Sequence, residues 1–252
     1  MENIIIENLS SHSEYKLCSL LFDTAKEYDA NLQTLLELIN KTSKRSLIVA
    51  PEVCLTGFDY ENYEKAVEFS HVASEALKKA SKDKIIIVTM LERRDDKVFN
   101  FAKIFHNGKI VYERAKAKLF RFGNEHKYMS EGSDEDIKIV EVDGIKIGIL
   151  ICFELRFKEF WQKLEGCDVI AVPSWWGVLR TEHFRVLTQS LAIINQCYVV
   201  ASDSQNEECT KMSGITRPHG EDERNADRAC LEVAYDKKEI ITMRRYMDVG
   251  IG

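Results

Sequence analysis

The 252-residue sequence predicts an α/β fold that forms one domain, residues 1–252. Three observations support this prediction. Short β-branched runs alternate with longer stretches of helical period, no linker rich in Pro, Gly or Ser divides the chain, and no repeat of fixed period occurs. Because strands that are separated by helices usually form crossover connections, we expect a largely buried parallel or mixed sheet.

Nine runs rich in β-branched and aromatic residues predict strands. They cover residues 16–22, 46–50, 84–91, 98–106, 109–116, 145–152, 169–174, 197–202 and 229–235. The fourth and fifth runs flank Asn107-Gly108, a dipeptide that favours the tightest hairpin turns because both of its residues accept a positive φ. These two runs therefore predict an antiparallel hairpin.

Four stretches predict helices because their apolar residues recur every three or four positions. They cover residues 29–41, 63–80, 156–164 and 182–196. In the first of them, Leu32, Leu35 and Ile39 share one face. The charged stretches at residues 133–141 and 221–228 predict solvated loops.

Composition and charge exclude several classes of protein. The chain is 30% charged and 45% hydrophobic, which is typical of a globular protein and excludes disordered and collagen-like chains. Its net charge of -6 argues against a broad nucleic-acid-binding surface. The apolar runs fall far short of the roughly 20 residues that span a bilayer, and the first residues lack the basic segment of a signal peptide. We therefore expect a cytoplasmic protein with neither nucleic-acid nor membrane partners.

The seven cysteines carry their own information. No two of them have the Cys-x-x-Cys spacing of zinc sites and of thioredoxin-type redox motifs. An odd number of cysteines without a secretory leader indicates a reducing compartment. The sequence therefore predicts no metal and no cofactor, and most of the cysteines are expected to be small buried hydrophobes.

Three predicted strands end at a reactive side chain. Glu52 follows the second strand, Lys116 ends the fifth, and Cys152 ends the sixth, just before a predicted helix start at Phe153. Ligands of open α/β sheets bind at the carboxyl ends of strands. We therefore expect the carboxylate, the amine and the thiol to meet at one site.

These three groups together predict acyl transfer through a thioester. The pKa of a thiol falls beside a cation or at a helix N-terminus, and Cys152 is expected to have both. Glu52 can take the thiol proton and later give it to a leaving amine. Lys116 and the backbone N–H of Phe153 can stabilise the oxyanion. Amine release and then hydrolysis by water complete the reaction.

Each residue alone also has a plainer interpretation. A strand-terminal cysteine is usually buried and inert, a lone glutamate is often a turn acid, and a lone lysine is usually solvated on an edge strand. A rival scheme pairs Cys152 with His183 or His219, oriented by Asn225 as in papain-like enzymes. A metal site built from His219, Glu221 and Asp222 is weaker still, because an exposed acidic loop explains these residues.

Several segments resemble the nitrilase superfamily of carbon–nitrogen hydrolases. They are APEVCLTGF, RAKAKLF, GILICFELRFKEFW, LEGCDVIAVPSWW and NQCYVVASD. The resemblance implies a four-layer α-β-β-α sandwich and assembly as a homodimer or a higher homo-oligomer. It also implies that Glu52 is the general base, Lys116 the oxyanion-stabilising lysine and Cys152 the nucleophile. Glu125, in the segment FGNEHKY, matches a second family glutamate that positions substrate and supports the lysine.

Within that family, residues 119–132 look most like the ω-amidase branch, which hydrolyses the terminal amide of short α-keto dicarboxylic acid monoamides. Four departures concern substrate and local structure more than catalysis. They are Lys118 where histidine is common, Phe153-Glu154 in place of Tyr-Asp, Gly177 in place of proline and Phe22 in place of glutamine. Residues 1–15 extend beyond the family start, as an added edge strand or an oligomer contact.

Aromatic residues near the strand ends are candidates for the wall of a small substrate pocket. They are Phe58, Tyr60, Phe122, Trp175 and Trp176. For Phe58 and Trp175 a role in the core is an equal alternative. Arg156 is interpreted as a structural ion-pair partner. The candidates in sequence for binding a substrate carboxylate are Arg121, His126 and Lys127, among which the sequence does not choose.

The resulting hypothesis is an amidohydrolase that acts on a small linear amide and releases ammonia. An alternative with the same triad is an N-carbamoyl amine amidohydrolase. A third hypothesis, of a different class, is a catalytically silent binding subunit, against which the intact set of four polar residues argues. A fourth, a cysteine redox sensor, requires a resolving cysteine near Cys152, and none is adjacent in sequence.

Overall fold

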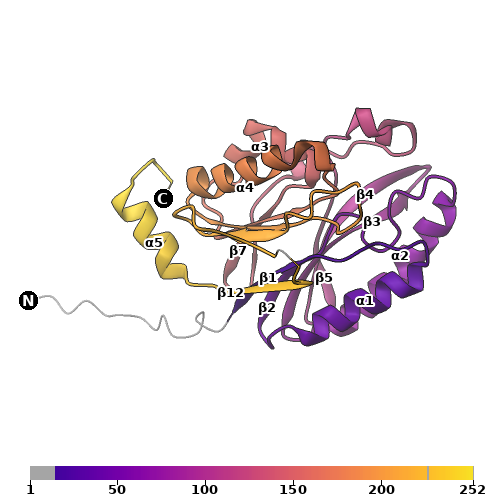
Figure 1. Ribbon diagram of the computed structural model, residues 1–252, viewed down its shortest axis with the longest axis horizontal. Coiled ribbons are helices and arrows are strands. Elements are labelled where there is room, and N and C mark those ends of the chain that lie inside the picture. The colour runs from indigo at the N-terminus through magenta and orange to yellow at the C-terminus, as the bar shows by residue number, and fades with distance from the viewer. Residues whose placement is uncertain (1–14, 226, 252) are drawn as a thin grey trace, which may run out of the picture.

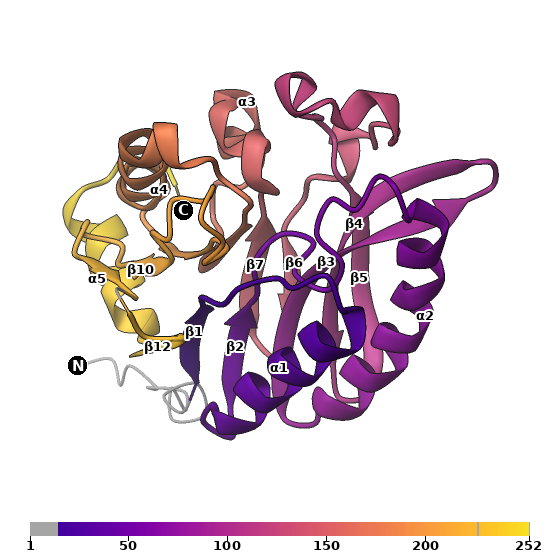
Figure 2. The ribbon, with the colours of Figure 1, turned by 45° about the vertical axis from the view of Figure 1, so that its right-hand side comes forward.

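A computed structural model describes residues 15–225 and 227–251 of the chain. In it the chain folds into four layers, with two stacked sheets between two layers of helices (Figure 1). Among these residues the strands form two six-stranded sheets, in the orders β12-β1-β2-β3-β4-β5 and β11-β10-β9-β8-β7-β6. Figure 2 shows α1 and α2 on the outer side of the first sheet and α3 and α4 beyond the second. The predicted α-β-β-α sandwich is confirmed.

The first sheet combines a parallel centre with antiparallel edges. β1, β2 and β3 pair in parallel, while β4, β5 and β12 pair antiparallel to their neighbours. Its strands are β1 (Lys16–Leu20), β2 (Ser46–Val49), β3 (Lys84–Arg94), β4 (Lys97–His106), β5 (Lys109–Ala115) and β12 (Cys230–Ala234). Helices α1 (Tyr28–Lys41) and α2 (Tyr63–Ala80) bury Leu35 and Leu77 against its outer face.

The second sheet follows the same plan. β7, β8 and β9 pair in parallel, and β6, β10 and β11 pair antiparallel at the edges. Its strands are β6 (Val140–Val142), β7 (Ile145–Ile149), β8 (Val169–Pro173), β9 (Tyr198–Ser202), β10 (Gly214–Thr216) and β11 (Asp222–Arg224). Helices α3 (Lys158–Lys163) and α4 (Thr181–Asn195) cover it with Phe160 and Phe184, and α5 (Lys237–Tyr246) follows β12.

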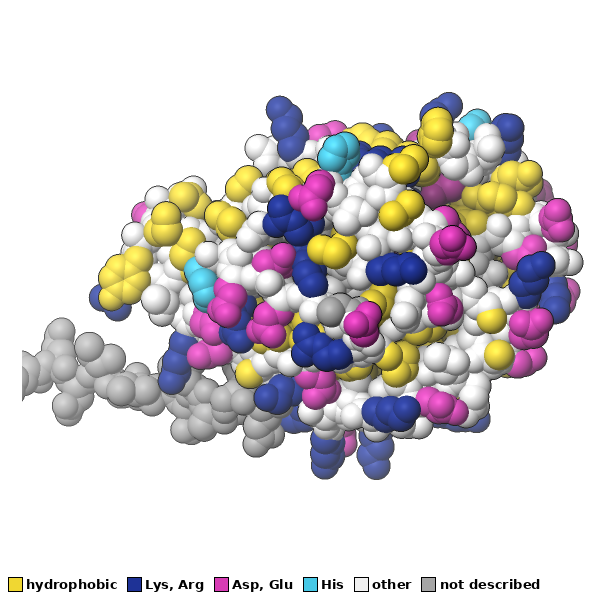
Figure 3. Space-filling model, in the orientation of Figure 1, with side chains coloured by type: hydrophobic (Ala, Val, Ile, Leu, Met, Phe, Trp, Pro, Cys, Tyr) yellow, Lys and Arg dark blue, Asp and Glu magenta, His cyan; other side chains and the backbone are white. Residues whose placement is uncertain are grey.

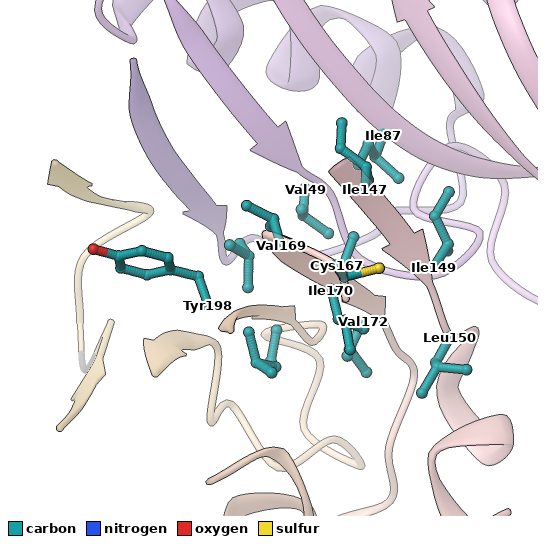
Figure 4. Close-up of a cluster of buried hydrophobic side chains, with 14 of the residues drawn as sticks. Val49, Ile87, Ile147, Ile149, Leu150, Cys167, Val169, Ile170, Val172 and Tyr198 are labelled. Atoms are coloured by element: carbon teal, nitrogen blue, oxygen red, sulfur yellow. The ribbon is translucent and has the colours of Figure 1, made fainter. Parts of the chain in front are cut away.

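The space between the sheets is filled by aliphatic side chains from both of them. Val49 and Ile87 of the first sheet belong to the same buried cluster as Ile147 and Val169 of the second (Figure 4). Each such side chain contributes about 1.5–3 kcal/mol when it is fully buried. This packing holds the carboxyl ends of β2 and β7 in fixed positions.

The predicted hairpin at Asn107-Gly108 is confirmed. β4 and β5 pair antiparallel around it, with His106 opposite Lys109. Asn107 and Gly108 have φ values of 46° and 81°, so both central residues of the turn take the positive φ that such turns require. The hairpin brings Lys116, the residue after β5, back beside β4.

The charged stretches are not loops throughout, so that prediction was wrong in part. Residues 140–142 form β6 and residues 222–224 form β11, at the two edges of the second sheet. Edge strands tolerate charged side chains because one of their sides faces solvent. Helix α5 was also missed, because Ile240 is its only fully buried residue and its apolar signal is therefore weak.

The edge strand or oligomer contact expected for residues 1–15 lies, apart from Tyr15, outside the described residues. Within the described ranges, every helix is too short or too polar to cross a lipid bilayer.

Candidate active site

The three predicted strand ends converge. Lys116 Nζ lies 2.7 Å from Glu52 Oε1 and 2.9 Å from Glu125 Oε1. Both the lysine and Glu52 are completely buried, and Glu125 and Cys152 are nearly so. Cys152 lies close enough for the charges of these groups to shift the pKa of its thiol. The structure therefore brings together all four polar residues that the sequence singled out.

Cys152 is held at a sharp bend of the backbone. Its φ is 46°, in the left-handed region that non-glycine residues rarely adopt. The expected helix start at Phe153 is only a short 3₁₀ turn over Cys152–Arg156, and α3 begins at Lys158. So short a turn has little dipole, and it adds little to the stability of a thiolate.

A buried ion pair between Arg114 and Glu154 connects this bend to the backbone beside Lys116. Arg114 Nη1 donates to Glu154 Oε1 at 2.9 Å, and Arg114 Nη2 donates to Glu154 Oε2 at 2.5 Å. The same carboxylate accepts the N–H of Ala117 at 2.6 Å and the N–H of Ile151 at 2.7 Å. Glu154 therefore holds the residue after Lys116 and the residue before Cys152, a role that the sequence did not suggest.

The Glu52 carboxylate has two further donors. Asn100 Nδ2 donates to Oε1 at 2.8 Å, and the N–H of Trp175 donates to Oε2 at 3.2 Å. Asn100 lies on β4, is fully buried, and also accepts the Lys116 N–H through its backbone oxygen at 2.8 Å. The sequence did not indicate a role for Asn100, because its contacts with Glu52 and Lys116 depend on the pairing of two strands.

Glu125 reaches Lys116 from a separate loop. It begins a 3₁₀ turn over Glu125–Lys127, and its Oε2 accepts the N–H of Phe120 at 2.9 Å. Lys116 thus lies between two carboxylates, and hydrogen bonds fix the outer oxygen of each. The ammonium group has little freedom to move.

The protonation state of Cys152 differs from the expectation. Burial and the charge of Glu52 raise the pKa of the Cys152 thiol well above its usual value, and Lys116 offsets this only in part. Burial would lower the pKa of Lys116, but Glu52 and Glu125 raise it well above the usual value. The resting site therefore holds a neutral thiol and a charged lysine, so attack requires a base.

A small pocket opens at the thiol. Its lining consists of aromatic rings, two guanidinium groups and the thiol itself. The lining residues are Phe120, Cys152, Phe153, Arg156, Trp175, Trp176, Gly177 and Arg180. The Cys152 thiol donates to the carbonyl oxygen of Trp175 at 3.7 Å, so the sulfur faces the wall that the two tryptophans form.

The predicted pocket aromatics divide into three groups. Trp175 and Trp176 line the pocket. Phe58 and Tyr60 lie outside its lining, with Phe58 against Trp175 at a ring separation of 6.0 Å. Phe122 is 86% exposed and does not line the pocket either, while Phe120, two residues earlier, does.

The interpretation of Arg156 as a structural ion-pair partner was wrong. Its guanidinium lies 4.8 Å from the centre of the Trp176 ring, and that of Arg180 lies 5.3 Å from the centre of the Phe120 ring. Among residues 15–225 and 227–251, neither guanidinium has a carboxylate within 4.0 Å. Burial and the neighbouring charge of Arg180 lower the pKa of Arg156. The pocket therefore contains uncompensated positive charge.

The three carboxylate-binding candidates chosen from the sequence lie elsewhere. Arg121, His126 and Lys127 are exposed and do not line the pocket. They lie near Glu125 in sequence, but the 3₁₀ turns direct Glu125 inward and leave its neighbours outside. Proximity in sequence was a poor guide here.

The rival histidine schemes find no support in the geometry. His183 Nδ1 contacts Arg156 Nη2 at 3.2 Å, and His219 Nε2 pairs with Glu221 at 3.4 Å. In the described part of the chain, neither histidine hydrogen bonds to Cys152. Among the described residues, His219, Glu221 and Asp222 do not form a group that could hold a metal ion, and Asp222 pairs with Arg224.

Asp203 is a further buried residue that shapes the pocket. Its Oδ1 accepts the N–H of Trp176 at 2.7 Å, and its Oδ2 accepts the N–H and the hydroxyl of Thr210 at 2.9 and 2.6 Å. Burial raises the pKa of Asp203 to about 7, against the opposing effect of these donors. Asp203 thus fixes the backbone of the pocket wall.

Replacing Asp203 with asparagine is expected to flatten the pH dependence of stability. The folded pKa lies above the unfolded value of about 3.9, so the contribution of Asp203 is fully present below about pH 4 and is lost as the pH rises to about 7. The difference in unfolding free energy between wild type and D203N should change by up to about 1.4 kcal/mol per pH unit in that window. Urea unfolding at several pH values measures it, and parallel curves for the two proteins would contradict it.

The chain is similar to a known protein family and to several of its members. The family model described as Carbon-nitrogen hydrolase matches residues 18–225. Over 171 residues the chain is 35% identical to the 2-oxoglutaramate amidase of Bacillus subtilis (strain 168); the match covers 65% of this chain and spans 65% of the length of that relative. Over 199 residues it is 28% identical to the omega-amidase YafV of Escherichia coli (strain K12), covering 76% of this chain and 77% of the relative.

A solved structure shows the same fold. Nit3 of Saccharomyces cerevisiae, described as a member of branch 10 of the nitrilase superfamily, matches with a TM-score of 0.78 at 21% identity. The match covers 94% of this chain and 95% of that one. The likeness extends over both sheets and their helices.

Proposed function

Because the chain belongs to the carbon–nitrogen hydrolase family, we propose that it is an amidohydrolase of the ω-amidase branch. It cleaves the amide C–N bond of a small linear substrate through a thioester on Cys152 and releases ammonia. The observation that carries this proposal is Lys116 bridging Glu52 and Glu125 beside a thiol at the base of a pocket. All four residues act in one reaction.

The first half-reaction forms the thioester. Cys152 Sγ attacks the amide carbonyl carbon while the Glu52 carboxylate takes the thiol proton, since the raised pKa of the thiol leaves it neutral at rest. Burial also raises the pKa of Glu52, which makes it a stronger base. The developing oxyanion is stabilised by Lys116 and by the N–H of Phe153. Glu52 then gives the proton to the leaving nitrogen, and the C–N bond breaks.

The second half-reaction hydrolyses the thioester. A water molecule enters the place vacated by ammonia, and Glu52 takes one of its protons as the oxygen attacks the carbonyl carbon. The C–S bond breaks, the proton returns to Cys152 Sγ, and the product acid leaves. Glu125 keeps Lys116 charged and oriented in both halves through the 2.9 Å contact between them. No cofactor takes part in these steps.

The pocket favours a substrate with a carboxylate. Arg156 and Arg180 offer two guanidinium groups without carboxylate partners in the described chain, each over an aromatic ring. A guanidinium binds a carboxylate with charge-assisted hydrogen bonds. The relative named 2-oxoglutaramate amidase acts, by its name, on a substrate of this kind. We therefore assign short α-keto dicarboxylic acid monoamides as the substrate class.

Replacing Arg156 with alanine is expected to raise KM for a keto-acid monoamide about 10- to 100-fold, because a charged hydrogen bond contributes about 1.5–3 kcal/mol. The kcat/KM for a neutral amide such as butyramide should change little. Arg185 is the matched control, because it pairs with Glu182 at 3.0 Å and does not line the pocket. Equal losses on both substrates in R156A would contradict the assignment.

The experiment that tests the function is ammonia release across a panel of keto-acid monoamides, neutral amides and N-carbamoyl amines. The proposal expects the highest kcat/KM for the keto-acid monoamides. Faster turnover of carbamoyl amines would assign the chain to that alternative activity. Absence of turnover in the whole panel would favour a catalytically silent subunit.

We further propose that the protein is cytoplasmic and forms a homodimer or a higher homo-oligomer. α4 exposes Val186, Ile193 and Ile194, with 47%, 43% and 54% of each side chain accessible. Figure 3 shows hydrophobic side chains over this helix, mixed with charged ones. Light scattering coupled to gel filtration is expected to give at least twice the chain mass, and V186E/I193E should shift it to one chain. A monomeric wild type would contradict this.

A further inference from the structure

Two paired strands at one edge of the first sheet place two thiols and a carboxylate together. β1 and β12 pair with Cys18 opposite Glu232 and Leu20 opposite Cys230. Because residues two apart on a strand share a face, all three ligand-type side chains lie on the same side of the sheet. One potential ligand atom from each lies within 4.8 Å of the other two.

The carboxylate of this cluster is held in place. Glu232 Oε1 accepts the N–H of Ser43 at 2.8 Å, and Oε2 accepts the Ser43 hydroxyl at 2.9 Å. The Cys18 sulfur lies 3.3 Å from Glu232 Oε1. Outer hydrogen bonds of this kind orient the ligands of a metal site. Cys18 is fully buried, Cys230 is half-buried and Glu232 is exposed, so the cluster can be reached from solvent.

The charge around the cluster suits a divalent ion. Lys84 Nζ is anchored to the backbone oxygens of Thr42 and Ser43 at 2.9 and 2.8 Å, and its charge acts on all three members of the cluster. When both thiols are neutral, the positive charge of Lys84 and the negative charge of Glu232 cancel. The net charge is also zero when two thiolates and one carboxylate face one charged lysine and one divalent ion. Binding therefore exchanges two thiol protons, which pass to solvent, for one ion.

We propose that Cys18, Cys230 and Glu232 bind one thiophilic divalent ion, with zinc as the best fit and water as the fourth ligand. Zinc–sulfur bonds of about 2.3 Å in a tetrahedron place two sulfurs about 3.8 Å apart, within the spread of this cluster. Thiolate ligands disfavour calcium and magnesium, which take oxygen ligands. The ion joins β12 to β1, and Glu232 connects it through hydrogen bonds to Ser43 in the loop between α1 and β2.

The test uses the full chain with Cys152 replaced by alanine, so that the active-site thiol does not bind the probe. After incubation with zinc chloride and gel filtration, metal analysis is expected to find one zinc per chain. Cobalt chloride should give the visible bands of a tetrahedral site and the near-ultraviolet band of a thiolate ligand. Zinc should also protect Cys230 from iodoacetamide and raise the Tm.

Two variants at accessible side chains keep the test decisive even if Cys18 variants fail to fold. C230S is expected to abolish zinc retention, and E232Q should raise the zinc Kd about tenfold or more. C197A is the matched control, because Cys197 also lies beside another cysteine, Cys167. This variant should leave zinc binding unchanged.

Three results would overturn the proposal. They are no retained zinc in the C152A chain, retention that C230S does not reduce, and an unchanged zinc Kd in E232Q. A chain mass that is lower by two hydrogens, and that returns to the full value after treatment with reductant, would show a disulfide between Cys18 and Cys230 instead. None of these results bears on the amidase assignment, because ammonia release by the wild-type chain is measured separately.

Discussion

Replacing Cys152 with alanine is expected to reduce ammonia release by about 10⁴-fold or more, since no other group can form the thioester. The fold should survive, because the side chain loses one sulfur at the edge of a pocket rather than in the centre of the core. Initial rates of ammonia release on the best keto-acid monoamide, with the Tm as the measure of folding, check both statements.

Cys54 supplies the matched control for this variant. It is completely buried, and burial raises the pKa of its thiol to about 12. C54A should retain kcat within a few-fold at a temperature where it is folded. Comparable activity losses in C54A and C152A, at equal folded fractions, would contradict the special role of Cys152.

Replacing Lys116 with methionine is expected to lower both the activity and the stability of the protein, for two separable reasons. Loss of the oxyanion partner costs about 10²- to 10³-fold in kcat. In addition, Glu52 and Glu125 become buried carboxylates without their cation, which destabilises the fold by about 3–5 kcal/mol. Urea unfolding measures the stability loss, and kcat at low temperature measures the catalytic loss.

A variant of Lys103 serves as the control that separates the loss of stability from the loss of catalysis. Its Nζ lies 2.5 Å from Glu92 and 2.9 Å from Glu113, and only 4% of its side chain is exposed. It is therefore a second nearly buried lysine between two glutamates, remote from the pocket. K103M should lose stability in a comparable way while kcat stays near that of wild type. A K116M protein that is destabilised but fully active would refute the role of the lysine.

The sequence predicted the fold well where its pattern was strong. Continuous apolar strands and amphipathic helices have unambiguous periods, and the Asn-Gly turn specified the hairpin. It failed at β6, β11 and α5, where few side chains are buried and backbone pairing or local propensity determines the structure. Such elements carry little hydrophobic signal.

The site shows a similar division. Glu52, Lys116 and Cys152 were found because strand ends are visible in sequence, and Glu125 because its segment resembles a family motif. Asn100 and Arg180 were missed, since each reaches the site only through tertiary contacts.

The expected low pKa of Cys152 was wrong for a physical reason. Lys116 does lie nearby, but its charge is shared by two carboxylates, so burial and Glu52 outweigh it. Proton transfer from the thiol to Glu52 thus becomes part of the attack rather than a preceding equilibrium. The sequence shows which groups are near each other more readily than it shows the balance of their charges.

The most direct test of the central claim is the mass of the intact chain, quenched in acid during turnover of a slowly hydrolysed keto-acid monoamide. Our account predicts an adduct that equals the substrate minus ammonia, located on the peptide that contains Cys152 and absent from C152A. An adduct on another residue, or sustained ammonia release by C152A, would contradict it.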